Sequence, residues 1–119
     1  MASTRGLLKC WVEQGNPAAI VRAQGEVDLS SADILRSCIE RAFRRARPVV
    51  VDLSQVTYMD GSGFRVLETM TARAGGEARA FWVVPGGHVR RLLTLLGLRT
   101  IPVADSLEEA IDRCFLARG

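Results

Sequence analysis

The chain has 119 residues, of which 48% are hydrophobic, and this length and composition predict one folded domain with a substantial core. Its formal charge of +3 comes almost entirely from arginine, and no run of basic residues exceeds two, which argues against nucleic-acid binding. Three cysteines without a CxxC spacing exclude the common zinc patterns and fit a reducing compartment. No apolar stretch has the length of a signal-peptide core or a membrane span, so we expect a cytoplasmic protein without membrane insertion.

Short apolar runs predict two strands and one helix in the first part of the chain. Residues 7–13 and 18–23 are expected to pair as a hairpin around a turn that contains Pro17. Ser30 or Ser31 is expected to cap the following helix. The apolar stripe of that helix consists of Ile34, Leu35, Cys38, Ile39 and Ala42.

Strands and helices then alternate to the end of the chain. Residues 49–53 and 78–84 read as apolar strands, and Ile101 with Val103 suggests a short final one. A helix is expected from Gly61 to the Gly75-Gly76 pair, with Gly63, Val66, Leu67, Met70 and Ala74 facing inward. A shorter helix that stops at Gly97 directs Val89, Leu92, Leu93 and Leu96 inward. Ser106 and Glu109 form a capping box for the last helix, with a stripe of Leu107, Ala110, Ile111 and Cys114.

This alternation predicts an α/β fold. The expected architecture is a mixed, mostly parallel β-sheet with an antiparallel edge strand, packed against about four helices. We interpret residues 1–119 as a single domain with a core over about residues 7–116, and we see no linker or internal repeat.

The strongest functional signal lies where the strand that begins at Val49 runs into the next helix. Residues 60–63 read Asp-Gly-Ser-Gly, so that one hydroxyl stands between two glycines at the helix opening. Helix openings expose unpaired N–H groups and carry partial positive charge, which suits a phosphate or a carboxylate. The sequence therefore predicts a site at this turn.

Three segments resemble the STAS domain family of bacterial anti-sigma factor antagonists. They are Gly-Glu-Val-Asp at 25–28, Asp-Leu-Ser-Gln-Val-Thr-Tyr-Met-Asp-Gly-Ser-Gly at 52–63, and Val-Arg-Arg-Leu-Leu-Thr-Leu-Leu-Gly-Leu at 89–98, and they occur in order and at the family's spacing. The resemblance implies a STAS-like fold and a protein that binds an anti-sigma factor, often an ATP-dependent serine kinase, and so frees a sigma factor for transcription. It also implies a serine phosphatase as a further candidate partner.

The resemblance breaks at the position that matters most for regulation. The family carries a phosphorylated hydroxyl residue directly after the aspartate, and this chain has Gly61 there. Ser62 matches the family's second hydroxyl position and is the phospho-acceptor candidate, although a register change of one residue turns an acceptor by about 100° around a helix. The alternative is that the Ser62 hydroxyl caps the helix. We therefore expect an antagonist that lacks the usual phosphoserine switch.

The docking surface implied by the resemblance comprises Asp28, Ser30, Asp60, Gly61, Ser62, Gly63, Phe64 and Arg65. Phe64 is expected to be an exposed anchor, with a ring tucked against the sheet as the alternative. Arg65 is expected to contact a partner, to pair with Asp60 or to remain solvated. Asp28 fits either a partner contact or a helix cap.

Other functions receive less support from the residues. A STAS scaffold or accessory subunit of a stress-signalling or transport complex needs no phospho-acceptor and remains the alternative. An enzyme is not expected, because Asp60 and Phe64 occupy positions where a nucleophile elbow needs glycines, and neither a metal cluster nor a cofactor motif is present. Cys38 and Cys114 are redox candidates, with buried packing as the alternative. The sequence does not predict the oligomeric state.

Overall fold

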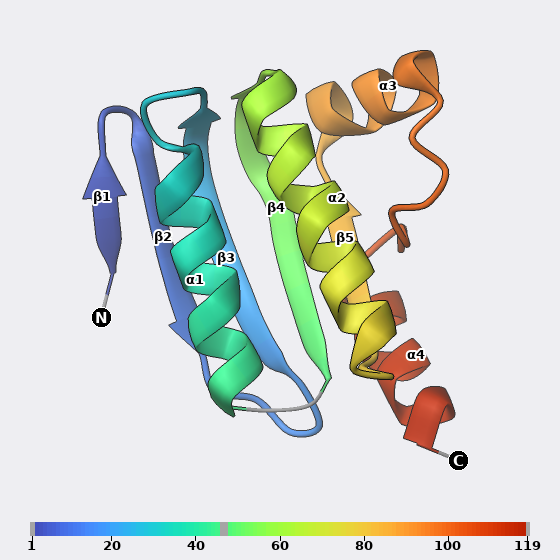
Figure 1. The fold of residues 1–119 in the computed structure, drawn as a ribbon. Helices are drawn as coiled ribbons and strands as arrows, with labels where there is room; N and C mark the ends of the chain where they lie inside the picture. Colours follow the sequence, from blue (N-terminus) through green and yellow to red (C-terminus); the bar gives the residue numbers. More distant parts are fainter. Residues whose placement is uncertain (1, 46–47, 119) are drawn as a thin grey trace.

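The computed structural model describes residues 2–45 and 48–118, and these form one α/β unit (Figure 1). The strands are β1 (Ser3–Arg5), β2 (Leu8–Glu13), β3 (Ala19–Val27), β4 (Val49–Met59) and β5 (Phe81–Pro85). The helices in the described residues are α1 (Ala32–Arg45), α2 (Gly61–Gly76), α3 (Gly87–Leu96) and α4 (Leu107–Arg118).

The strands form one mixed sheet in the order β1-β2-β3-β4-β5. β1, β2 and β3 pair antiparallel, whereas β3, β4 and β5 pair parallel. The predicted fold class is thereby confirmed. β1 was not predicted, because its polar residues show no apolar alternation. The predicted last strand is reduced to a single parallel bridge between Val83 and Val103.

The sheet separates two apolar clusters. α1 and α2 lie side by side over one face, with α3 near the end of β5, and α4 lies against the opposite face (Figure 1). Side chains alternate between faces along a strand, so Val49 and Val51 join the main cluster while Val50 joins the one under α4. Burial on both faces explains why this strand reads as a continuous apolar run.

A polar row crosses the second face beside α4. Arg22 Nη1 donates to Asp52 Oδ2 at 2.7 Å and Arg22 Nε donates to Glu13 Oε2 at 3.0 Å. The Trp11 indole N–H also donates to Glu13 Oε2, at 3.1 Å. Donation from Trp11 and then from Arg22 lowers the pKa of the Glu13 carboxyl below its ordinary value. Asp52 is 5% exposed, so the hydrogen bonds from Arg22 and from the Ser54 N–H replace the water that its carboxylate lacks.

Two predicted helix-end signals, the glycine that stops α3 and the capping box that starts α4, are seen in the structure, and one predicted inward position on α3 is not. Gly97 stops α3 with a φ of 65°, the left-handed conformation that glycine adopts most easily. The Leu98 N–H then donates to the Leu93 carbonyl, and Leu98 packs against the main cluster. The predicted inward position of Leu96 is wrong, because Leu96 sits in the last turn of α3 and is 57% exposed. The Ser106 hydroxyl accepts the Glu109 N–H at 3.0 Å, as the capping box predicts.

In the described part of the chain, we find no helix whose length and apolar character would let it cross a membrane.

Candidate functional site

Two aspartates meet where the parallel strands β3 and β4 end. Val27 and Met59 are register partners, and Asp28 and Asp60 follow them directly. The Asp60 N–H donates to the Val27 carbonyl at 3.1 Å, which ties the two strand ends together. The carboxyl ends of adjacent parallel strands are common positions for binding groups. The fold therefore brings together the Asp28 turn and the Asp60 turn, which the sequence separates by 31 residues.

Asp60 is the N-cap of α2. Its Oδ1 accepts the Ser62 N–H at 2.9 Å and also accepts the Ser62 hydroxyl. The interpretation that Ser62 caps the helix is therefore wrong, because Asp60 holds the N-cap position and the Ser62 hydroxyl donates to its carboxylate. The Ser62 hydroxyl is half-buried and is held on the Asp60 carboxylate.

The two glycines that flank Ser62 have different surroundings. A Cβ atom added at Gly61 would meet no heavy atom within 4 Å. A Cβ atom added at Gly63 would lie 2.5 Å from Met59 Cγ and 2.9 Å from Val27 Cγ1, closer than side chains tolerate. Gly63 thus permits the close approach of α2 to the strand ends. Gly61 has no such packing requirement.

The predicted exposure of Phe64 is wrong. Phe64 is 3% exposed and belongs to the main apolar cluster. The reason is helical geometry: Phe64 lies three residues before the buried Leu67 and Gly63 lies four before it, so both share the Leu67 face. Val66, which was expected to take that face, is only partly buried.

Arg65 extends outward from the first turns of α2. It is exposed, and no ion pair between Arg65 and Asp60 exists among the described residues. Of the interpretations considered for Arg65, pairing with Asp60 is therefore wrong.

The Asp28 turn is ordered by its own hydroxyl groups. Asp28 Oδ1 accepts the Ser30 N–H at 2.9 Å, the Ser30 hydroxyl at 2.6 Å and the Ser31 hydroxyl at 3.3 Å. These bonds, that from the Ser30 hydroxyl above all, lower the pKa of the Asp28 carboxyl below its ordinary value. Ser31 is buried, and its hydroxyl accepts the Asp28 N–H at 3.1 Å. The turn therefore presents an ionised carboxylate in a fixed position.

A hollow of about 210 Å³ lies between this turn and α2. Its lining residues are Leu29, Arg36, Ser62, Arg65, Val66 and Thr69. Leu29 is 84% exposed, and we had not predicted it or Arg36 as site residues. An apolar residue between Asp28 and Ser30 in a polar turn was the signal that would have identified Leu29. The site thus combines an apolar side chain, two guanidinium groups and the Ser62 hydroxyl.

Tyr58 and His88 form an aromatic pair at the same end of β4. Their rings stack with centroids 5.4 Å apart, and Tyr58 is 44% exposed. His88 Nε2 lies 3.5 Å from the Met59 carbonyl oxygen. Because Tyr58 is two residues before Asp60, this pair adds an exposed aromatic ring to the residues around the Asp60 turn.

The redox candidates Cys38 and Cys114 belong to different clusters. Cys38 packs in the main cluster and Cys114 in the cluster under α4, on the other side of the sheet. All three cysteines are buried and free. In the described residues, no group of three His, Cys, Asp or Glu side chains is placed to hold a metal ion.

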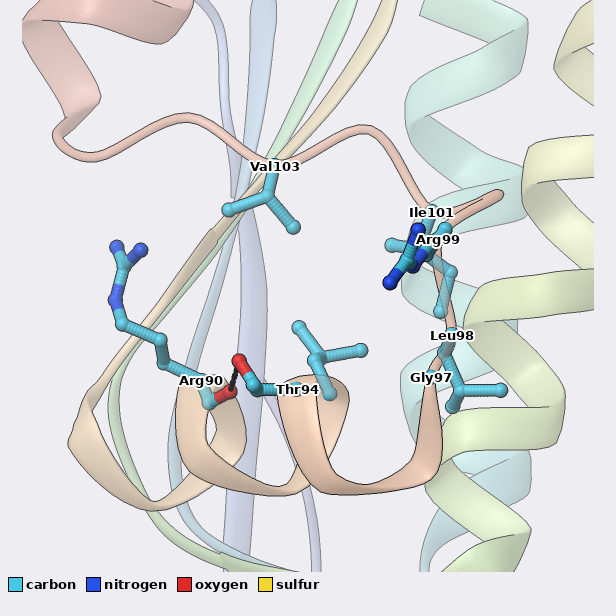
Figure 2. A pocket seen from close by; sticks show the side chains of 8 residues that line it. Arg90, Thr94, Gly97, Leu98, Arg99, Ile101 and Val103 are labelled. Carbon is cyan, nitrogen blue, oxygen red and sulfur yellow. Dashed lines mark hydrogen bonds between the residues drawn. The ribbon is translucent and has the colours of Figure 1, made fainter.

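A second hollow, of about 390 Å³, lies between α3 and the segment that follows it. Figure 2 shows Arg90 and Arg99 on opposite sides of this hollow, with Val103 between them. Leu93, Leu98 and Ile101 supply apolar walls. None of the residues predicted as site residues lines it, so it is separate from the Asp28 and Asp60 turns.

Comparisons with known proteins place these features in context. The chain is 30% identical over 110 residues to an anti-sigma F factor antagonist of Paenibacillus polymyxa, covering 87% of this chain and 92% of that one. It is 28% identical over 102 residues to the anti-sigma-F factor antagonist RsfB of Mycobacterium tuberculosis, covering 84% of each. The crystal structure of an anti-sigma factor antagonist from Mycobacterium paratuberculosis superposes with a TM-score of 0.81 at 28% identity, covering 90% of this chain and 93% of that one.

The STAS domain family model matches residues 11–110, a range that contains β3 to β5, the three helices α1 to α3, and both aspartate turns. This match covers most of the chain and agrees with the relatives in sequence and in structure. The chain belongs to the STAS domain family, on the branch of the anti-sigma factor antagonists.

Proposed function

We propose that this protein is an anti-sigma factor antagonist that binds its anti-sigma factor through the Asp28 and Asp60 turns, without a phosphoserine switch at position 61. The observation that carries the proposal is the Asp60 turn, which lies within the range that the STAS family model matches, and in which Asp60 caps α2 and is followed by Gly61, a residue without a hydroxyl. The relatives' names support the partner class, and they are regulators rather than enzymes. We expect the protein to act in the cytoplasm, where sigma factors work.

Leu29 supports a docking role for this edge. It is the most exposed of the large hydrophobic side chains in the described residues, and it borders the hollow that contains Ser62. An exposed aliphatic side chain beside two arginines favours a partner surface that offers an apolar pocket with acidic groups nearby. We propose that Leu29, rather than the buried Phe64, is the apolar anchor of the interface.

The absence of a hydroxyl at Gly61 supports constitutive binding. In a family member with a hydroxyl there, a phosphate would bring a charge of about −1.5 to −2 next to Asp28 and Asp60, and this charge would oppose docking. Gly61 cannot carry that group. Ser62 is the remaining hydroxyl, and its hydrogen bond to Asp60 directs it toward the carboxylate.

The first experiment is a pull-down from an extract of the source organism, with partners identified by mass spectrometry. We expect an anti-sigma factor, whose affinity is then measured with purified proteins. Leu29→Ser and Ser62→Glu should each weaken binding at least tenfold, while Leu95→Ser, a matched change at an exposed leucine on α3, should leave it unchanged. Capture of transporter subunits or sensor assemblies without an anti-sigma factor would instead support a STAS scaffold.

The second experiment tests the switch, with Gly61→Ser as the informative variant. The open space around Gly61 admits the new side chain. If the recovered anti-sigma factor is a serine kinase, it should transfer phosphate from ATP to Gly61→Ser but not to the wild type. Labelling of the wild type that disappears in Ser62→Ala would show that Ser62 is an acceptor and would refute a switch-free antagonist. The phosphate-labelled Gly61→Ser protein then serves as the substrate with which a partner serine phosphatase is tested.

A further inference from the structure

The hollow between α3 and the segment that follows it, residues 97–103, combines apolar walls with positive charge (Figure 2). Its volume of about 390 Å³ is in the range of pockets that hold small organic molecules. The apolar walls are the buried Leu93 and Ile101 and the partly buried Leu98 and Val103. Apolar surface is therefore left for an occupant to cover.

The segment that borders the hollow is fixed at both ends by backbone hydrogen bonds. At its start, the Leu98 N–H donates to the Leu93 carbonyl at 3.1 Å. At its end, the Val83 N–H donates to the Pro102 carbonyl and the Val83 carbonyl accepts the Ala104 N–H, both at 2.9 Å. The hollow is therefore formed before any ligand enters, and binding requires little ordering of the chain.

Two guanidinium groups lie on opposite sides of the hollow, and its described lining contains no acidic side chain (Figure 2). Arg90 Nη1 donates to Asp105 Oδ1 at 3.0 Å, so a carboxylate outside the lining offsets the charge of Arg90. Arg99 is exposed, and within the described residues it forms no ion pair. One uncompensated positive charge beside apolar walls favours a ligand with one negative charge and an apolar body.

We propose that this hollow binds a monocarboxylate with an unbranched apolar chain, a medium-chain fatty acid. Its carboxylate pairs with the Arg99 guanidinium, which can donate two parallel hydrogen bonds to it, and its chain lies along Leu98 and Val103. A phosphate monoester carries a charge of about −1.5 to −2, for which one free guanidinium is a poorer match. The site is independent of anti-sigma factor binding, since its lining residues lie outside both aspartate turns.

The test titrates the full-length protein with hexanoate, octanoate and decanoate below their micelle concentrations and follows the backbone amides by NMR. We expect the largest shifts at residues 97–103. Each added CH₂ that enters the hollow should tighten binding by up to about fourfold. Octanol, which has the same chain without the charge, should bind about tenfold more weakly than octanoate, and octyl phosphate should bind no more tightly than octanoate.

Three variants test the parts of the site. Arg99→Met should weaken octanoate binding about tenfold and leave octanol binding unchanged. Arg91→Met is the matched control, because it removes the same charge from an exposed position on α3 outside the lining, and it should bind octanoate as the wild type does. Thr94→Phe places a ring in the hollow from an exposed helix position, and it should abolish binding of every chain length.

Circular dichroism checks that each variant is folded, and the wild-type titration decides the question even where a variant is not. The proposal is overturned if no amide shifts up to the solubility limit, if the shifts lie away from residues 97–103, or if octanol binds as tightly as octanoate. Tighter binding of octyl phosphate would overturn the assignment of a carboxylate. Failure of all three carboxylates, together with protection of these amides by the anti-sigma factor, would make the hollow a protein-docking surface and also overturn the proposal.

Discussion

The two glycines beside Ser62 provide a sharp test of how α2 packs on the sheet. Alanine at position 63 would place its Cβ 2.5 Å from Met59 Cγ and 2.9 Å from Val27 Cγ1, and both of these side chains are 0% exposed. Overpacking of this kind costs about 1–3 kcal/mol. Replacing glycine by alanine in a helix recovers about 0.5–1 kcal/mol. We therefore expect Gly63→Ala to lower the free energy of unfolding by about 1 kcal/mol, within a range of about 0–2.5 kcal/mol.

Gly61→Ala is the matched control, because its Cβ would meet no atom within 4 Å and it lies in the same turn. It should leave the free energy of unfolding unchanged or raise it by about 0.5 kcal/mol. Urea denaturation measures both variants. With an m value of about 1.5 kcal/mol/M, a loss of 1 kcal/mol lowers the midpoint by about 0.7 M. If Gly63→Ala unfolds at the same urea concentration as Gly61→Ala with an unchanged m value, the close-packing argument for Gly63 is refuted.

Three further predictions concern the scaffold. Arg22→Met should lower the free energy of unfolding in urea by about 1–3 kcal/mol, because it leaves the buried Asp52 carboxylate without its guanidinium partner. An effect below about 0.5 kcal/mol would contradict this reasoning. Gly97→Ala should cost about 1 kcal/mol, since alanine disfavours a φ of 65°, and an unchanged melting temperature would argue against it. The carboxyls of Glu13 and Asp28 have pKa values below their ordinary values of 4.5 and 3.8, so each stabilises the folded protein fully above its ordinary value, and this stabilisation is lost as pH falls below that value. Thermal unfolding between pH 3 and pH 7 measures the effect. A melting temperature that rises on acidification would contradict it.

The local pattern of the chain was sufficient for most of the fold. Three consecutive β-branched residues at Val49–Val51 predicted a strand buried on both faces, and the structure places it inside the sheet between β3 and β5. Ser106 with Glu109 predicted the start of the last helix, and Gly97 predicted the end of α3. Such signals are reliable because caps, turns and periodicity act within a few residues of the chain.

The candidate site was predictable only in part. The sequence placed Asp28, Asp60 and Ser62 in turns, but the parallel pairing of β3 and β4 decides that the two aspartate turns are neighbours. The roles of the side chains around them also depend on that packing. Asp60, not Ser62, provides the cap, and Leu29 rather than Phe64 is exposed.

What the sequence determined by itself is therefore the presence and order of β2 to β5 and of the helices α1 to α4, and the family to which the chain belongs, whereas it missed β1 and overstated the last strand. Only the tertiary structure decided which face of α2 turns inward, because periodicity identifies an apolar stripe but leaves its exact centre to the way the helix meets the sheet. It also decided that Cys10 and Cys38 share the main cluster, whereas Cys114 lies in the cluster under α4 on the other face of the sheet. Two residues 28 positions apart enter one cluster only when α1 packs on β2, and no local pattern encodes that packing.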